Sequence, residues 1–541
     1  MKKTIKNIII TLIIGIVLYY FMLPPINITS PAFWTFVVML LFVYAMLNLT
    51  SESLKENLVI NSTNIALKGN PFKAKGAKYT IALIVIIIAG IALINFIFSP
   101  LFNANKFANR IAVLDTTDFT TDVAEVDFSS IPLLDKASSQ KLGDRKMGQM
   151  SDLVSQYVVS NLYTQINYNS DIVRVTPLEY ASVIKYFTNR SGGVEGYIIV
   201  NSVTGDSDLI RLENGMRYMP SALFGEDLQR HLRFNYPTTI FGDANFEIDN
   251  EGKPFWIVPT IKYVGVGTRT EISGVVVVDA VTGDSKKYKV GEVPSWIDHV
   301  YEADLIIEQV DHWGEYNGGF FNSIFGQKNV INTTVGYNYL ALEDDIYVYT
   351  GITSVSTDES NIGFILSNMR TKETHFYSVP GAEEFSAMAS AEGLVQEKSY
   401  TASFPLLINL NNRPTYLLSL KDFAGLVKMY AFVDVEDYQK VSTSDSSLGI
   451  NVAAEKYLND YNLGNTAINN EEKTIKVKSI ETAIIDGNTH YYITDSENKN
   501  YSVSVKVERN LLPFLKAGDE VEITYSTGNV NNIATIKQKQ D

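Results

Sequence analysis

The sequence predicts an α+β protein with an N-terminal three-helix transmembrane anchor, tandem modules in which a helix covers an antiparallel sheet, and a C-terminal five-stranded β-barrel. Three observations predict this fold class: three apolar segments lie within the first hundred residues, β-branched strands ending in polar turns recur after them, and five short strands close the chain. The expected boundaries are residues 1–99 for the anchor, 100–240 for the first module, 241–330 for the second, 331–450 for the third and fourth, 451–472 for a helix and linker, and 473–541 for the barrel.

The apolar segments are Ile8–Leu23, Ala32–Leu49 and Tyr79–Phe98. At ~1.5 Å per residue the third segment spans about 30 Å, the hydrocarbon thickness of a bilayer. The first two segments are shorter, at about 24 and 27 Å, and the prolines between them predict a tight hairpin. A cleaved signal peptide is the alternative for the first segment, but Tyr19–Pro25 lacks the small residues of a cleavage site, which favours an uncleaved anchor.

The lysines predict the orientation of the anchor. Three precede the first segment and five lie before the third, whereas the hairpin loop Pro24–Pro31 has none. The positive-inside rule therefore predicts a multipass protein of the cell membrane with a cytoplasmic N-terminus and with residues 100–541 outside the cell. Lys106 and Arg110, just beyond the third segment, argue weakly against this orientation. The eight lysines are Lys2, Lys3, Lys6, Lys55, Lys68, Lys73, Lys75 and Lys78.

The charge balance follows the same division. Of the 45 basic and 60 acidic residues in the chain, residues 1–99 hold eight lysines and two glutamates, so the remainder has a net charge of −21. Nucleic acid and anionic lipid would repel so acidic a domain, which leaves the bilayer around the anchor, a cell-envelope protein, cations or a neutral wall polymer as expected partners. The chain has no cysteine, which excludes a disulfide framework and a thiol nucleophile and is typical of a bacterial surface.

An internal repeat organises the external residues. Gly196–Leu212 and Gly274–Val290 share a glycine, an apolar strand and a Val-Thr-Gly-Asp-Ser turn at an offset of 78 residues, and Gly363–Val379 and Met429–Val441 repeat the plan more loosely. Each copy predicts a strand that enters a tight turn and leaves as a second strand. Hairpins are predicted before three of the copies, at Phe246–Lys262, Tyr339–Ser354 and Phe404–Lys421.

Helices are predicted between the repeats, at Thr176–Asn189, Phe224–Phe234, Ser295–Trp313 and Ala382–Glu392. Thr176, Pro177 and Glu179 have the pattern of a capped helix start. A hairpin with a third strand forms a small sheet that has one apolar face to cover, so we expect each unit to be one helix laid on a three-stranded sheet.

A resemblance to a known family follows from these units. A helix rich in Ala and Glu, a hairpin, and a strand running into Val-Asp-x-x-Thr-Gly-Asp, here Val278–Asp284, resemble the PepSY-type module of secreted and membrane-tethered bacterial proteins. Gly381–Val441 and Phe246–Val290 carry the resemblance best. It implies a module that regulates peptidases or takes part in cell-surface assembly and has no catalytic residues of its own. The whole chain also resembles multipass membrane proteins of Gram-positive bacteria, for which the resemblance implies no activity.

The C-terminal residues have a different pattern. Five strands and a short helix at Arg509–Leu515 give the order β-β-β-α-β-β, which resembles the OB-type barrel. Such barrels often bind single-stranded nucleic acid through basic grooves and stacked aromatic side chains. Residues 473–541 contain nine basic and nine acidic residues, so their charge argues against nucleic acid. The predicted strands are Thr474–Ile485, Thr489–Thr494, Tyr501–Val507, Glu520–Tyr525 and Asn532–Ile536.

No catalytic, cofactor-binding or metal-binding residue is predicted. The histidines are scattered, without the H-E-x-x-H spacing that places two metal ligands on one helix face. No G-x-S-x-G motif is present, so a serine nucleophile has no support. The five histidines are His231, His299, His312, His375 and His490.

Acidic clusters are the remaining chemical candidates. Paired carboxylates can act as the acid and base of a glycosidase or bind Ca²⁺. No calcium-loop spacing is present, and aspartates that cap their own turns account for the pattern. The three tryptophans of the external domain lie in apolar segments, which favours the core over a sugar-stacking surface. The residues concerned are Asp115–Asp122, Glu343–Asp345, Asp434–Asp437, Asp206, Asp284, Trp256, Trp296 and Trp313.

Two functions from different classes fit these observations. The first is a non-catalytic surface protein whose modules bind or regulate another envelope component, such as a peptidase, or act as an assembly scaffold. The second is an extracellular hydrolase with a carboxylate-based site between modules. A transporter accessory is less well supported, because the apolar segments contain no charge that would mark an ion path.

Overall fold

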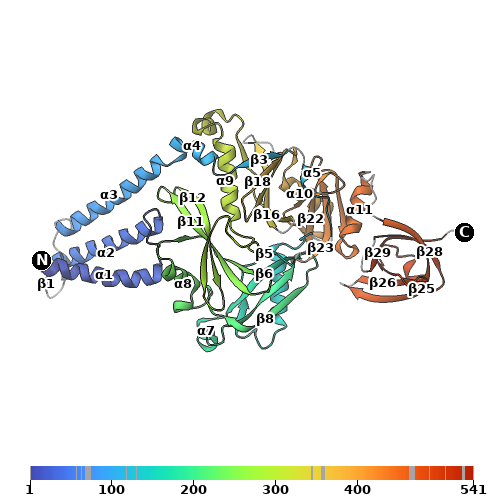
Figure 1. The fold of residues 1–541 in the computed structure, drawn as a ribbon, viewed down its shortest axis with the longest axis horizontal. Helices are drawn as coiled ribbons and strands as arrows, with labels where there is room; N and C mark the ends of the chain where they lie inside the picture. The colour runs from blue at the N-terminus through green and yellow to red at the C-terminus, as the bar shows by residue number, and fades with distance from the viewer. Residues whose placement is uncertain are drawn as a thin grey trace.

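A computed structural model of the chain confirms the α+β class (Figure 1). The anchor lies at one end of the long axis and the closed barrel at the other, with four sheets between them. The structure describes residues 2–56, 58–61, 64–67, 75–116, 119–128, 131–169, 171–342, 345–354, 360–461, 463, 470–485, 488–505, 507–526 and 530–539.

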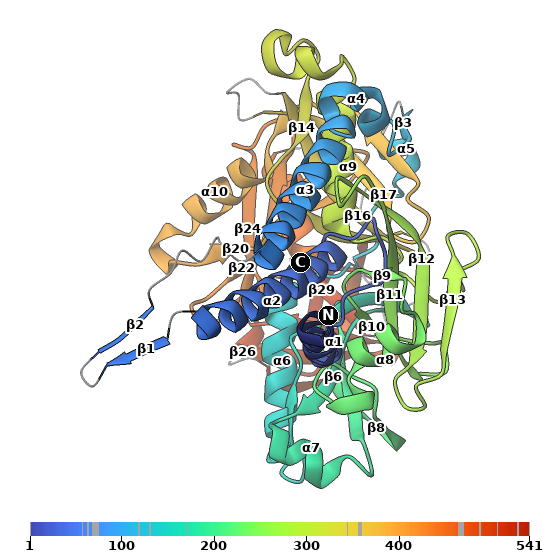
Figure 2. The ribbon, with the colours of Figure 1, turned by 90° about the vertical axis from the view of Figure 1, so that its left-hand side faces the viewer.

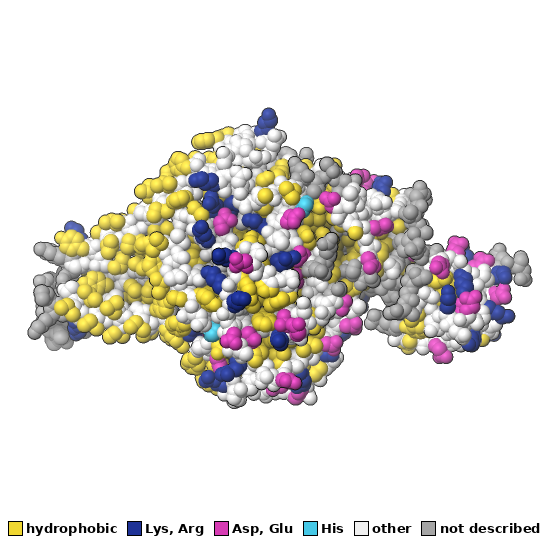
Figure 3. Space-filling view, in the orientation of Figure 1, with side chains coloured by type: hydrophobic (Ala, Val, Ile, Leu, Met, Phe, Trp, Pro, Cys, Tyr) yellow, Lys and Arg dark blue, Asp and Glu magenta, His cyan; other side chains and the backbone are white. Residues whose placement is uncertain are grey.

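Three N-terminal helices are long and apolar enough to cross a membrane: α1 (Lys2–Met22), α2 (Pro31–Glu56) and α3 (Lys75–Ile97). A two-stranded hairpin, β1 (Leu58–Asn61) and β2 (Asn64–Leu67), lies between α2 and α3. Most side chains of these helices are exposed, and Figure 3 shows a continuous apolar surface over them. So much exposed apolar surface would be costly in water, as expected for helices surrounded by lipid.

The four sheets share one plan. Two short strands pair with the same long second strand, and a third and a fourth strand follow. Sheet 1 contains β4 (Tyr157–Val159), β5 (Thr164–Tyr168), β6 (Asp171–Tyr180), β7 (Val194–Asn201) and β8 (Ser207–Met216). Sheet 2 contains β9 (Ile240–Phe241), β10 (Asn245–Ile248), β11 (Pro254–Val264), β12 (Arg269–Asp279) and β13 (Ser285–Lys289).

Sheets 3 and 4 repeat this plan. Sheet 3 contains β14 (Ile331–Thr333), β15 (Asn338–Leu342), β16 (Asp345–Ser354), β17 (Ser360–Asn368) and β18 (Thr374–Tyr377), with β19 (Gly381–Ala382) on β17 and β3 (Val113–Thr116) parallel to β18. Sheet 4 contains β20 (Thr401–Ala402), β21 (Leu406–Asn409), β22 (Pro414–Lys421), β23 (Val427–Asp434) and β24 (Val441–Asp445). The expected three-stranded sheet is therefore too small, because the first strand is divided and a fourth is added.

One helix precedes each sheet, and we call each helix with its sheet a module. The helices are α6 (Lys136–Gly148), α8 (Leu228–Asn235), α9 (Ala303–Tyr316) and α10 (Glu384–Leu394). In every module the carbonyl of the residue after the third strand accepts a backbone N–H from the segment before the helix, at 2.8–3.1 Å. The donor and acceptor residues are Leu134 and Ser202, Tyr218 and Ala280, Tyr301 and Met369, and Ala382 and Val435. The modules thus repeat a hydrogen-bonding pattern as well as an order of elements.

The helix expected at Thr176–Asn189 is wrong in its first part. Thr176–Tyr180 belongs to β6, and only α7 (Val183–Asn189) is helical, with Ser182 accepting the Lys185 N–H at its start. Thr176 is fully buried and pairs with Ile198 of β7, so sheet formation outweighs the local capping pattern. The helix expected from Ser295 also begins later, at Ala303.

The sheets stack so that an inner sheet is buried on both faces. On β12, Val276 and Val278 join a core shared with sheet 1, whereas Val275 and Val277 join the core shared with α9 and sheet 3. The expectation of one apolar face per sheet is therefore wrong for sheet 2, because the neighbouring modules cover both sides. A strand that is buried on both faces needs apolar residues at every position, which explains the continuous run of valines in β12.

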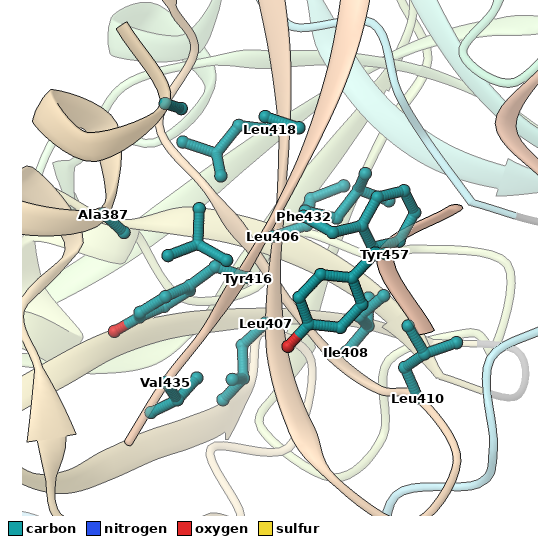
Figure 4. Packing of buried hydrophobic residues seen from close by; sticks show 14 of the residues in the cluster. Ala387, Leu406, Leu407, Ile408, Leu410, Tyr416, Leu418, Phe432, Val435 and Tyr457 are labelled. Atoms are coloured by element: carbon teal, nitrogen blue, oxygen red, sulfur yellow. The ribbon is translucent and has the colours of Figure 1, made fainter. Parts of the chain in front are cut away.

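Sheet 4 lies between two helices. One of its faces contacts α10 and sheet 3 through Tyr416, whose ring centroid lies 5.9 Å from that of Phe364. The other face packs against α11 (Ile450–Asp460), where Phe432 stacks on Tyr457 at 5.9 Å (Figure 4). The helix α11 therefore closes the end of the stack.

The C-terminal strands form the expected five-stranded barrel. They are β25 (Asn470–Ile485), β26 (Asn488–Asp495), β27 (Asn500–Ser504), β28 (Glu520–Ser526) and β29 (Asn531–Gln538). The barrel closes in the order β25-β26-β27-β29-β28, with β27 and β29 parallel and the short η6 turn (Leu512–Phe514) between β27 and β28. Its strands enclose a separate core that includes Val503 and Val521.

Hydrogen bonds attach the anchor to module 2. In the loop between α1 and α2, the Ile26 N–H donates to the Pro237 carbonyl at 2.8 Å, and the Arg233 guanidinium donates to the Leu23 carbonyl at 2.9 Å. At the end of α3, Asn95 donates to the Val266 carbonyl and accepts the Val266 N–H, at 3.1 and 2.9 Å. The anchor and the stack are therefore held in one arrangement.

The repeat turns allow a test of the fold. Gly205 and Gly283 occupy equivalent positions with φ of +80° and +79°, but a Cβ on Gly283 would lie 2.4 Å from the Tyr218 ring, whereas one on Gly205 would meet nothing closer than 3.5 Å. We expect Gly205→Ala to lower the free energy of unfolding by about 1 kcal/mol and Gly283→Ala by a further ~1–3 kcal/mol. Denaturant titration of both variants measures this, and equal losses would contradict the contact with Tyr218.

Candidate functional site

A cavity of about 470 Å³ lies where modules 1, 2 and 3 meet. We call it the junction cavity. Side chains from all three modules line it, so it exists only when the modules are stacked. Its lining residues are Lys136, Tyr163, Thr164, Gln165, Arg174, Asp243, Asn245, His299, Tyr301, Glu302, Ala303, Asp304, Tyr337, Tyr339 and Met369.

Arg174 is the most unusual residue of the junction cavity. It lies in the middle of β6 and is 6% exposed, between the buried residues Val173 and Val175. One guanidinium N–H donates to the Gln165 side-chain oxygen at 2.6 Å, across the pairing of β5 with β6. In the part of the chain that the structure describes, no carboxylate oxygen lies within 4.0 Å of this guanidinium. Asp135 interacts with the guanidinium electrostatically from a longer distance. Burying a charge without a carboxylate in direct contact is costly, which is unusual for a purely structural residue.

Three buried hydrogen-bond donors on residues that line the cavity have no partner among the described residues. They are Nε of Arg174, Nε2 of Gln165 and the hydroxyl of Tyr163. Buried donors are nearly always satisfied by protein, water or ligand. Burial lowers the pKa of Arg174 to about 10, so the guanidinium stays protonated at neutral pH. Arg174 and Gln165 therefore provide a permanent positive charge and unpaired donors. These are the groups that bind a carboxylate or phosphate.

Acidic residues lie elsewhere on the cavity lining. Asp243, Glu302 and Asp304 contribute to it, and Glu302 accepts the Asp243 backbone N–H at 3.0 Å. Burial raises the pKa of Glu302. Burial also raises the pKa of Tyr337 and of Tyr339, so both phenols remain neutral and can donate hydrogen bonds. The junction cavity thus combines one buried cation with several acidic groups and suits a ligand that carries both an anionic and a cationic group.

Two buried carboxylates adjoin the cavity. Glu247 of β10 accepts the backbone N–H groups of Asp298 and His299 at 3.0 and 3.1 Å, and its oxygen lies 3.2 Å from Nδ1 of His299. Asp298 accepts the Asn167 N–H at 2.8 Å. Burial and the charge of Glu247 raise the pKa of Asp298 well above its ordinary value. These hydrogen bonds join modules 1 and 2 to the segment before α9 and give the pair a structural role.

The predicted candidate residues are dispersed. Of the five histidines, only His299 lines the junction cavity. His312 lies against Arg110 and Glu308, where burial and the charge of Arg110 lower its pKa to about 4. His231 contacts the Gly283 carbonyl, His375 pairs with Glu373, and His490 lies in β26 of the barrel. Among the described residues no group of three or more His, Cys, Asp or Glu could hold a metal ion.

The acidic clusters are mainly turns. Thr204 and Thr282 donate to Asp206 and Asp284 in equivalent repeat turns, and Asp434 accepts the N–H groups of Glu436 and Asp437. Asp345 pairs with Arg370 at 2.6 Å. Glu343, Asp344 and residues 117–118 of the cluster Asp115–Asp122 lie outside the described residues. None of the described acids of these clusters lines the junction cavity.

The tryptophans pack in cores. Trp256 is fully buried between sheets 1 and 2 and donates to the Tyr218 carbonyl at 2.8 Å. Trp296 packs on Phe255, and Trp313 lies beside Phe376. This arrangement gives no sugar-stacking surface formed by the three rings together.

Arg174 belongs to no sequence motif, so the sequence did not predict it as a site residue. One signal was present: Asp171–Tyr180 is an otherwise strand-like run in which a single arginine interrupts the apolar residues. Recognising that this arginine is buried requires knowing that sheet 1 is covered on the face where Arg174 lies. In comparisons with known proteins, no family model matches the chain and no curated relative matches it.

The buried carboxylate pair predicts a pH dependence of stability. Because the pKa of Asp298 is higher in the folded chain than the ordinary value of 3.8, the folded chain holds this proton at pH values where the unfolded chain has lost it. Stability then falls as the pH rises from about 3.8 toward the folded pKa, by up to about 1.4 kcal/mol per pH unit. Asp298→Asn should remove this loss, so the variant should gain stability relative to the parent chain as the pH rises.

Denaturant titrations between pH 4 and pH 8 measure the effect. Asp284→Asn, in an exposed turn, is the matched control and should run parallel to the parent chain. A constant difference between Asp298→Asn and the parent chain across this range would contradict the raised pKa of Asp298 in the folded chain.

Proposed function

We propose that the chain is a non-catalytic, multipass protein of the cell membrane whose external modules bind or regulate another component of the cell envelope. The three apolar helices support the membrane location, and the lysines before α1 and α3 support a cytoplasmic N-terminus with residues 100–541 outside. The junction cavity is the binding site. The observation that carries this proposal is the buried Arg174, which lines the cavity and whose Nε has no hydrogen-bond partner among the described residues.

The lining residues define the ligand chemistry. Arg174 and Gln165 bind a carboxylate or phosphate, and the acidic residues accept hydrogen bonds from an amine or hydroxyl group. A cavity of about 470 Å³ suits a group the size of a few amino-acid residues. The ligand that fits best is a peptide segment ending in a carboxylate, supplied by an envelope protein or a wall polymer.

The module plan supports this class of function. The helix followed by an antiparallel sheet agrees with the resemblance to PepSY-type modules, which bind or restrain peptidases, and the barrel order agrees with the OB-type resemblance. The balanced charge of residues 473–541 argues against nucleic acid as a ligand of the barrel.

A hydrolase with a carboxylate site between modules is the second candidate. Asp243, Glu302 and Asp304 favour it, because they lie together in a cavity between modules and burial raises the pKa of Glu302 toward that of a general acid. The two candidates differ in turnover. A hydrolase would lose its activity in Glu302→Gln, whereas a binding protein would show no turnover in either form.

Ligand-induced stabilisation tests the binding proposal. The full chain in detergent would be heated with inorganic phosphate, short peptides with free or amidated C-termini, and wall fragments. We expect the peptide with a free carboxylate to raise the Tm, because a ligand at 100 times its Kd adds about 2.7 kcal/mol to the free energy of unfolding.

The matched variants are Arg174→Gln and Arg211→Gln, since Arg211 lies on the exposed side of β8. Arg174→Gln should abolish the shift and Arg211→Gln should retain it. The proposal fails if amidation has no effect on the shift, or if both variants respond like the parent chain.

A further inference from the structure

Two exposed apolar patches lie on the side of the stack that carries the anchor. The first, the η3 patch, consists of Phe321, Ile324 and Phe325 around the short η3 turn (Asn322–Gly326) after α9, and these side chains are 51–80% exposed. The second, the α7 patch, consists of Val183, Ile184, Phe187 and Phe224, which are 51–72% exposed.

The η3 patch is continuous with the end of α3. The helix α4 (Pro100–Ala108) follows α3 directly, and its Phe102 contacts Phe96 of α3 with ring centroids 5.1 Å apart. Further along α4, Phe107 packs against Tyr316 at the end of α9, and Phe320 joins this cluster. The base of the η3 patch is therefore fixed to the helix that leaves the membrane.

Hydrogen bonds hold the turn in shape. The Asn322 side chain donates to the Lys328 carbonyl at 2.9 Å and accepts the Lys328 N–H at 3.2 Å. The rings of Phe321 and Phe325 stack with centroids 6.5 Å apart. Because the turn is fixed, the two stacked phenylalanines stay on the surface, where exposing them to water is unfavourable.

The α7 patch is continuous with the end of α1. Arg230 of α8 donates to the Phe224 carbonyl at 2.8 Å, and its guanidinium lies 4.4 Å from the ring centroid of Tyr20 in α1. The Phe187 ring lies 6.1 Å from the Phe224 ring. Tyr186, on the other side of α7, is buried and donates to Glu226, so α7 presents its apolar side outward.

Figure 2 places the two patches on opposite sides of the anchor. Seen from the anchor end, the segment after α9 lies at the top, α7 lies at the bottom, and the three apolar helices lie between them. In Figure 1 both segments lie in the half of the stack nearer the anchor, and the barrel lies at the far end.

We propose that these two patches insert into the outer interface of the membrane that the anchor crosses, and that the stack rests on the bilayer at both sides of its helices. The occupant is lipid, because α4 and its aromatic cluster connect the η3 patch to the outer end of α3. Arg230 connects the α7 patch to the outer end of α1. This inference goes beyond ligand binding and rests on the proposed membrane location of α1–α3.

The energetics favour a shallow, apolar contact. Each buried apolar side chain contributes about 1.5–3 kcal/mol, enough for the two patches to hold the stack against the bilayer once the anchor keeps it nearby. The net charge of −21 on residues 100–541 opposes contact with an anionic surface. Arg190 follows α7 and pairs with Glu226 at 3.9 Å, and Lys328 follows the η3 turn and is exposed.

The absence of cysteine makes a direct test possible. Single cysteines at Phe325 and Ile184 would carry an environment-sensitive fluorophore in the full chain, reconstituted in phosphatidylcholine vesicles. Quenching by lipids with a nitroxide near the headgroup reports contact with the interface, and quenching by lipids with a nitroxide deep in the acyl chain reports a position inside the bilayer, as expected for residue 13. Phe423→Cys, on the fully exposed turn between β22 and β23, is the matched control away from the membrane, and Ile13→Cys within α1 is the control inside it.

We expect labels at 325 and 184 to be quenched about twofold or more beyond the label at 423. Quenching at 13 but not at 325 or 184 would overturn the inference and leave the anchor intact. An absence of quenching at 13 would instead contradict the membrane location itself. Quenching at only one patch would overturn the two-sided contact.

Discussion

Burial of the sheets on both faces is the constraint on which this structure depends. An isolated module would expose one apolar face of its sheet, because the adjacent module or helix that covers that face would be missing. The valines of β12 illustrate the point, since alternate side chains serve different cores. The modules consequently form one stack, and the hydrogen bonds of Asn95 and Arg233 attach that stack to the anchor.

The junction cavity is a consequence of this stacking. Where the three sheets diverge, the shared cores end and a space is left between the modules. At this place the side chains are polar instead of apolar. The Glu247 and Asp298 pair satisfies its hydrogen bonds locally and joins the modules. Nε of Arg174 has no hydrogen-bond partner among the described residues. This difference distinguishes the candidate binding site from the polar groups that have a structural role.

The sequence predicted the features of the fold that depend on the local pattern of residues. Apolar length identified α1–α3, alternation and turn residues identified the barrel strands, and the recurring Val-Thr-Gly-Asp-Ser turn revealed the repeat. It did not predict features that depend on neighbours. Thr176 follows a helix-start pattern and lies in a strand because β7 pairs with it. Arg174 could be recognised as a site residue only after α6 and sheet 3 were seen to enclose it.

The same limit applies to the anchor. The lysine pattern predicts which side of the membrane the stack occupies, whereas the contacts of Arg230 with Phe224 and Tyr20 are seen only in the folded chain. The structure shows three helices long and apolar enough to cross a membrane at one end of the stack and the barrel at the other end (Figure 1). Our proposal places that stack on the outer membrane surface.

The side of the membrane on which the stack lies is the central claim, and cysteine labelling in intact cells tests it most directly. Single-cysteine variants Phe423→Cys and Thr4→Cys would be treated with a membrane-impermeant maleimide, with the cysteine-free parent chain as the blank. The account predicts labelling at 423 in intact cells and at 4 only after lysis. Labelling at 4 in intact cells, with 423 protected until lysis, would contradict it.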